Sequence, residues 1–168
     1  MAGILASRSG PAAAVRIAAA VGVFFVLPLS ALTFWQVRRG AWSTVDASRP
    51  SERPLLFAVG LAGLVALLIY FERTQPGTAF VRATAGVLVM IAVCAAVTPW
   101  VKVSLHMAAA SLAATVLLAR GHPLGWLLAA MLPALGWSRI ALGRHLWREV
   151  ALGLVLGACT GFAVTYIG

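Results

Sequence analysis

Charged side chains are scarce in this sequence, and acidic ones are the scarcest. Asp and Glu account for 4 of the 168 residues, and all charged residues together make up 10%. Hydrophobic residues make up 62%, and the mean hydropathy is +0.98. A chain with so little polar surface cannot cover a water-soluble globule. We therefore expect a multi-pass integral protein of a cell membrane.

The sequence is also poor in metal ligands. It contains 2 cysteines and 3 histidines. Cys94 and Cys159 lie inside apolar runs, far from any histidine spacing that suits zinc. We therefore expect no metal ion and no cofactor, and we assign both cysteines to ordinary packing.

Apolar runs separated by short polar stretches fill the chain. A helix rises about 1.5 Å per residue, and a hydrocarbon core is roughly 30 Å thick. The runs predict an all-α polytopic membrane helix bundle with about six transmembrane helices, at residues 17–35, 55–71, 83–100, 103–119, 124–137 and 150–167. The fifth run is short and contains Pro133, so we expect it to be tilted, kinked or extended through residues 140–143.

We interpret residues 1–168 as one domain with a short N-terminal tail at 1–16. The first apolar run lacks a good cleavage site, so we read it as an uncleaved helix rather than an export signal. Glycines inside the spans, including Gly60, Gly63, Gly153 and Gly157, favour close backbone approach between packed helices.

The remaining charge is gathered in three clusters between apolar runs, at residues 38–53, 102–106 and 138–149. If the six spans alternate in direction, these clusters are the connections that share one membrane face. His106 and His145 lie on this face, whereas His122 lies in a turn on the other. We expect the three clusters to meet in one composite site.

The residues of the clusters suit a phosphate group. His145 and Glu149 are four residues apart, which on the first turn of the last span would place them on one face. The carboxylate could then accept a hydrogen bond from one ring nitrogen, so that the other serves as nucleophile or base. Candidate donors to the phosphoryl oxygens are Arg53, Lys102, Ser104, Ser138 and Arg139.

The third cluster resembles the third signature of the type 2 phosphatidic acid phosphatase family, which reads Ser-Arg, five residues, His, three residues, Asp. Ser138, Arg139 and His145 match it, and Glu149 replaces the aspartate. The family's second signature, Pro-Ser-Gly-His, resembles the segment Val103-Ser104-Leu105-His106, which keeps the serine and the histidine.

The first signature of that family, a lysine followed after six residues by Arg-Pro, is matched least. Arg-Pro pairs begin at Arg49 and Arg53, but Trp42 and Asp46 stand where the lysine would be. We prefer Arg53, at the entry to the second span, with Lys102 or Arg49 as sources of the missing charge. The resemblance covers the chain from about residue 49 onward.

The resemblance implies a metal-independent lipid phosphate phosphatase with a phosphohistidine intermediate. His145 would attack phosphorus, Glu149 would orient its ring, and His106 would act in turn as acid and base. Arg53, Lys102, Ser104, Ser138 and Arg139 would hold the phosphate. The substrate would be an anionic membrane lipid, with phosphatidate, phosphatidylglycerol phosphate and polyprenyl phosphates or diphosphates all open.

Other classes of function are weighed against this one. The net charge of +9 suggests nucleic acid, but the chain has no basic soluble domain to present it, so no nucleic-acid partner is expected. A non-enzymatic protein that binds a polyprenyl phosphate or another lipid phosphate stays open. A transporter would show an internal repeat, which the sequence lacks.

Two properties are left open at this stage. The excess of Lys and Arg on the motif face points the site to the cytoplasm, whereas the resemblance points to the outer face, where many bacterial members of that family work. The oligomeric state is not indicated by any residue pattern.

Overall fold

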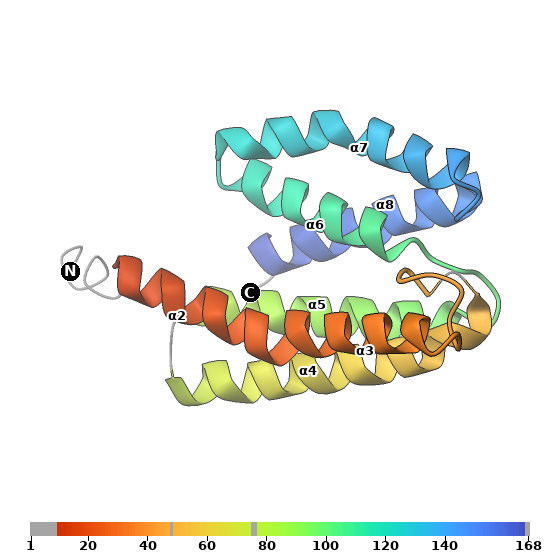
Figure 1. The fold of residues 1–168 in the computed structure, drawn as a ribbon. Coiled ribbons are helices and arrows are strands. Elements are labelled where there is room, and N and C mark those ends of the chain that lie inside the picture. The colour runs from red at the N-terminus through yellow and green to blue at the C-terminus, as the bar shows by residue number, and fades with distance from the viewer. Residues whose placement is uncertain (1–9, 48, 75–76, 167–168) are drawn as a thin grey trace. The chain divides into compact units, whose positions relative to one another are not determined.

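The computed structural model describes residues 10–47, 49–74 and 77–166, and the regular structure within them is helical throughout. The predicted all-α class is therefore confirmed (Figure 1). In chain order the elements are α2 (Pro11–Val21), the π-helical turn η2 (Gly22–Val26), α3 (Leu27–Arg38), the 3₁₀ turn η3 (Pro50–Glu52), α4 (Arg53–Thr74), α5 (Thr78–Val97), α6 (Leu105–Ala119), α7 (Pro123–Ala141) and α8 (Trp147–Tyr166).

The lengths of these helices fit a protein that crosses a membrane several times. Within the described residues, 5 helical segments are long and apolar enough to span a bilayer. The fourth predicted span corresponds to α6, which is apolar but has only 15 residues. α7 continues through Pro133 to Ala141, so the fifth span extends into the region 140–143 as expected. The first span begins at Pro11 rather than residue 17, which makes part of the expected tail helical.

Residue contacts group the chain into two compact units that divide within α5, between Leu88 and Val89. The interpretation of the chain as one domain stays a prediction. The polar cluster at 38–53 belongs to the first unit, and the clusters at 102–106 and 138–149 belong to the second.

In the first unit, α2, η2 and α3 form a continuous helical segment that lies along α4 (Figure 1). Pro28 has no N–H to donate to the carbonyl of Phe24, and the helix widens into the π turn beside it. Gly63 of α4 faces that carbonyl so closely that a Cβ there would collide with its oxygen. Ala20 of α2 packs with Leu67 and Phe71 of α4 in the buried core of this unit.

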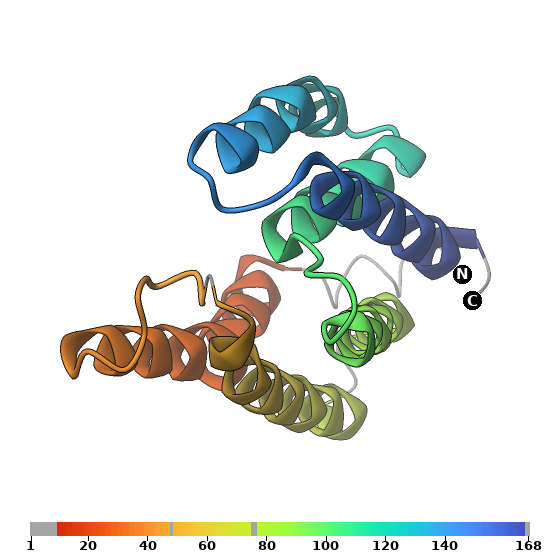
Figure 2. The ribbon, with the colours of Figure 1, turned by 90° about the vertical axis from the view of Figure 1, so that its right-hand side faces the viewer.

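In the second unit, α6 packs against both α7 and α8 (Figures 1 and 2). Glycines at every fourth position of α8 make the approach to α6 possible. A Cβ on Gly153 would lie 2.5 Å from the carbonyl oxygen of Ser104, and one on Gly157 would overlap the carbonyl of Ala108. Between the same helices the hydroxyl of Ser111 donates to the carbonyl of Leu154 at 2.8 Å. The close backbone approach predicted from Gly153 and Gly157 is confirmed.

Candidate functional site

The backbone of His145 is fixed by the way α7 ends. Gly143 follows the helix with φ of +64°, a left-handed conformation that glycine adopts without strain. Its N–H donates to Ile140 at 2.9 Å, and the N–H of Arg144 donates to the carbonyl of Arg139 at 3.1 Å. This is the Schellman motif of a helix C-terminus. The N–H of His145 also donates to the Arg139 carbonyl, at 3.2 Å, so Arg139 anchors His145 through its main chain.

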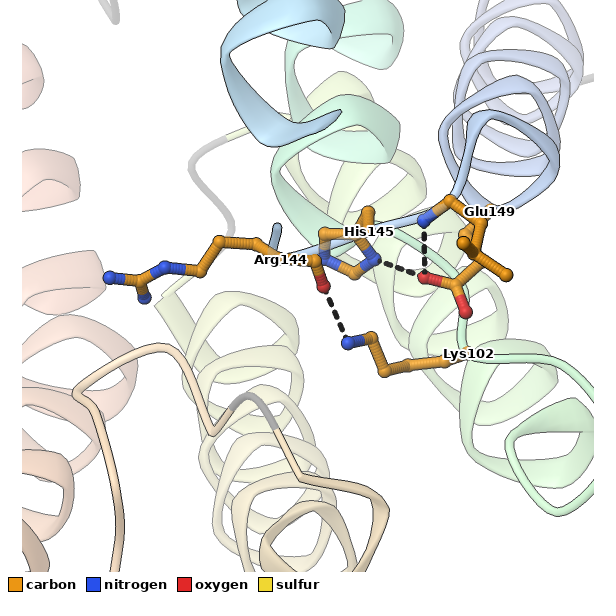
Figure 3. A network of polar contacts seen from close by, with 5 residues as sticks. Lys102, Arg144, His145 and Glu149 are labelled. Carbon is orange, nitrogen blue, oxygen red and sulfur yellow. Dashed lines mark hydrogen bonds and ion pairs between the residues drawn. The ribbon is translucent and has the colours of Figure 1, made fainter. Parts of the chain in front are cut away.

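The side chains of His145 and Glu149 form a close, largely buried pair. Nδ1 of His145 lies 2.8 Å from Oε2 of Glu149, and the two side chains are 8% and 14% exposed. A carboxylate only accepts hydrogen bonds, so Nδ1–H donates, and in the neutral ring the lone pair then lies on Nε2. Figure 3 shows the ring turned toward the carboxylate.

The contact predicted between these two residues is confirmed, but the helical reason given for it is wrong. α8 begins at Trp147, so His145 lies before the helix and Glu149 lies in its first turn. Oε2 of Glu149 reaches back to the N–H of Leu146 at 3.2 Å, as a glutamate does in a capping box. One carboxylate oxygen therefore caps α8 and holds the histidine ring.

The segment before α6 joins the same network from the other side. The N–H of Ser104 donates to the main-chain carbonyl of Glu149 at 3.1 Å. Nζ of Lys102 donates to the main-chain carbonyl of Arg144 at 2.5 Å, while the guanidinium of Arg144 extends away from the pair (Figure 3). Two of the three predicted clusters, 102–106 and 138–149, thus meet in the second unit.

Ser104 stands out among the polar residues of this region. It is completely buried, and its hydroxyl has no hydrogen-bond partner among the described residues. It precedes α6 without capping it through its side chain. A buried hydroxyl left unpaired costs about 1–3 kcal/mol. An acceptor that reached the N-terminus of α6 would remove this cost by bonding the Ser104 hydroxyl.

The other predicted site residues differ in how far they join this network. His106 is exposed on the first turn of α6. The side chain of Arg139 is buried, at 9% exposed. The hydroxyl of Ser138 donates to Leu135 of its own helix at 2.7 Å. Ser138 is therefore satisfied within α7.

Arg53 lies in the first unit, whereas His145 lies in the second. Arg53 is the first residue of α4 and is 3% exposed. The preceding loop is closed by Glu52, whose carboxylate accepts from the N–H groups of Ser43 at 2.8 Å and Arg49 at 3.1 Å. The expected role of Arg53 stays a prediction.

The described part of the chain contains no evident metal site. No group of three His, Cys, Asp or Glu side chains there is placed to hold a metal ion.

His122 caps α7 by accepting from the N–H of Leu124 at 3.3 Å, as expected for a turn residue.

Sequence reasoning missed the residues that build the site through their main chains. Gly143 carried a usable signal, because a glycine just past a helix commonly ends it in the left-handed conformation. The sequence holds no signal for the carbonyl of Arg144 or the N–H of Leu146, because almost every residue has both of these main-chain groups.

Comparisons with protein-family models, with curated proteins and with solved structures gave no match. The likeness of the three signatures to a phosphatase family therefore stays a resemblance.

Proposed function

We propose that this protein is a metal-independent lipid phosphate phosphatase of a bacterial inner membrane, acting through a phosphohistidine intermediate. The observation that carries the proposal is the pair formed by His145 and Glu149, with 2.8 Å between Nδ1 and Oε2 and with both side chains largely buried. A carboxylate on one ring nitrogen selects the tautomer in which the other is nucleophilic, and it stabilises the imidazolium that attack creates.

The proposed reaction has two steps. In the first, Nε2 of His145 forms a bond to phosphorus while the bond from phosphorus to the lipid oxygen breaks, and His106 gives its proton to that oxygen. In the second, His106 takes a proton from water, whose oxygen attacks phosphorus as the P–N bond breaks. Inorganic phosphate leaves, and both histidines return to their starting states. Glu149 remains a carboxylate throughout.

The phosphoryl oxygens need donors, and the buried hydroxyl of Ser104 supports this role best. It has no partner among the described residues, and a phosphate oxygen would satisfy it. Arg139 and Arg53 are the proposed cations, and the support for Lys102 is weaker, because its ammonium is bonded to the carbonyl of Arg144. The support for Ser138 is weaker, because its hydroxyl would have to leave the carbonyl of Leu135.

Exposed tryptophans support a lipid as substrate. Trp137, near the end of α7, is 72% exposed, and Trp147, the first residue of α8, is 69% exposed. Tryptophan is enriched where a membrane meets water, and these two flank the loop that carries His145. A phosphorylated headgroup at that level would meet the site while its chains stay in the bilayer. Phosphatidate, phosphatidylglycerol phosphate and polyprenyl phosphates or diphosphates all have this form.

A second candidate function is non-enzymatic binding of a lipid phosphate. Two observations favour it: the ammonium of Lys102 is bonded to a main-chain carbonyl, and no lysine occupies the first-signature position. A protein with this function would hold the same anion without turnover.

Phosphate release from purified protein separates the two functions. Wild-type protein in lipid nanodiscs would be given each class of lipid phosphate, and both bound lipid and free phosphate would be measured. Release above the protein-free rate supports the phosphatase. Saturable binding without release supports the carrier, and neither binding nor release contradicts both.

A further inference from the structure

Lys102 is the one lysine in a chain that has 13 Lys and Arg residues. Its main chain is firmly placed just before α6. Val103 beside it is completely buried, and Ser104 donates its N–H to the carbonyl of Glu149 at 3.1 Å. The base of the lysine side chain is therefore fixed relative to the start of α8.

The ammonium of Lys102 bonds the residue next to the histidine. Nζ donates to the carbonyl oxygen of Arg144 at 2.5 Å across 42 positions of sequence. The N–H groups of Arg144 and His145 both donate to the carbonyl of Arg139. The peptide group between Arg144 and His145 is thus held through its N–H by α7 and through its carbonyl by Lys102.

We propose that Lys102 is a positioning residue, which fixes the Arg144 carbonyl and thereby presents the His145 ring to Glu149. The expected effect on kcat rests on the proposed phosphatase function. The expected effect on the position of the His145 ring does not depend on that function. It goes beyond a phosphate-binding role for Lys102, because it assigns the lysine an effect on the protein without substrate.

The chemistry of the contact explains a lysine at this place. An ammonium is a compact charge suited to a single carbonyl oxygen, whereas a guanidinium presents a planar fork suited to a carboxylate or phosphate. Charged donors also form hydrogen bonds roughly twice as strong as neutral ones. The acceptor lies just beyond the C-terminus of α7, where the helix dipole favours positive charge.

The test compares wild type with Lys102→Met in lipid nanodiscs, without substrate and then with a short-chain phosphatidate. Selective ¹⁵N labelling of histidine gives ring signals for only His106, His122 and His145, and a His145→Gln variant assigns those of His145. In Lys102→Met we expect the His145 ring signals to move away from the single Nδ1–H tautomer. We expect kcat to fall by up to about 10²-fold, as for a misplaced catalytic group, with KM nearly unchanged.

Arg73→Met is the matched control, because it removes one exposed positive charge at the end of α4. It should leave the His145 signals and kcat as in wild type. Lys102→Gln, which keeps an N–H donor on a shorter stem, repeats the test if the Met variant does not fold. It should shift the same signals by less.

Unchanged His145 signals in a folded Lys102 variant would overturn the proposal. A rise in KM with kcat preserved would also overturn it, since that pattern belongs to a phosphate ligand alone. If the signals move but wild type releases no phosphate from any lipid phosphate, the proposed function fails and the positioning role stands.

Discussion

The carboxylate of Glu149 has two roles, because it contacts the His145 ring and caps α8. A single substitution can remove its negative charge and keep the cap. Its Oε2 accepts from the His145 ring at 2.8 Å and from the Leu146 N–H at 3.2 Å. In Glu149→Gln the amide oxygen can still accept from Leu146, because glutamine serves as well as glutamate in a capping box. We therefore expect the variant to fold and insert normally while it loses the negative charge beside the ring.

The size of the effect follows from that lost charge. The amide that takes its place is neutral, so it cannot stabilise the imidazolium formed on attack. We expect kcat to fall by roughly 10²-fold or more, which is about 2.7 kcal/mol at 1.36 kcal/mol per decade. Asp-to-Asn changes in histidine triads cost up to about 10⁴-fold. Both side chains are mostly buried, so solvent screens the pair little.

Glu149→Asp is the matched control, because it keeps the charge and shortens the side chain by one methylene. We expect it to retain measurable activity. Steady-state phosphate release from a short-chain lipid phosphate would be measured for all three proteins, with thermal unfolding to confirm that each is folded. Equal kcat in the Gln variant and wild type would refute the reasoning and leave Glu149 as a helix cap only.

Three further outcomes are expected. His145→Ala should abolish phosphate release with the protein still folded and membrane-inserted, and more than a small residual turnover would exclude His145 as nucleophile. Activity should survive excess chelator, because no metal-binding group of side chains lies in the described residues; loss in chelator with recovery in magnesium would contradict the mechanism. Gly157→Ala should destabilise the second unit by about 1–3 kcal/mol through overpacking, measured by denaturant titration against Gly22→Ala, whose added Cβ meets nothing within 4 Å.

Hydropathy predicted most of the fold because apolar length is a property of the sequence itself. The helical class and most of the spans follow from it. Helix ends follow less well: the extension of α7 past Pro133 depends on how its neighbours pack, and the π turn at Gly22–Val26 depends on a carbonyl freed by Pro28. These are local backbone adjustments that a hydropathy window averages out.

The candidate site was predictable where side chains meet close in sequence and not where main chains meet at a distance. The spacing of His145 and Glu149 indicated their contact, although His145 lies before the helix. The bond from Lys102 to the Arg144 carbonyl was not predictable, because it requires α6 and α8 to pack first. The hydrogen bond from the Ser138 hydroxyl to the Leu135 carbonyl was missed for another reason. The hydroxyl was assigned to a phosphate although an acceptor lies one turn earlier in the same helix.

The shortness of α6 has a consequence for the lipid around it. Its 15 residues reach about 22 Å at 1.5 Å per residue, short of a hydrocarbon core of roughly 30 Å. A mismatch of this kind is relieved by a thinner bilayer at the protein edge. Thinning at the N-terminus of α6 would bring headgroups and water to the level of Ser104 and Lys102, so a short helix here would give a lipid headgroup access to the candidate site.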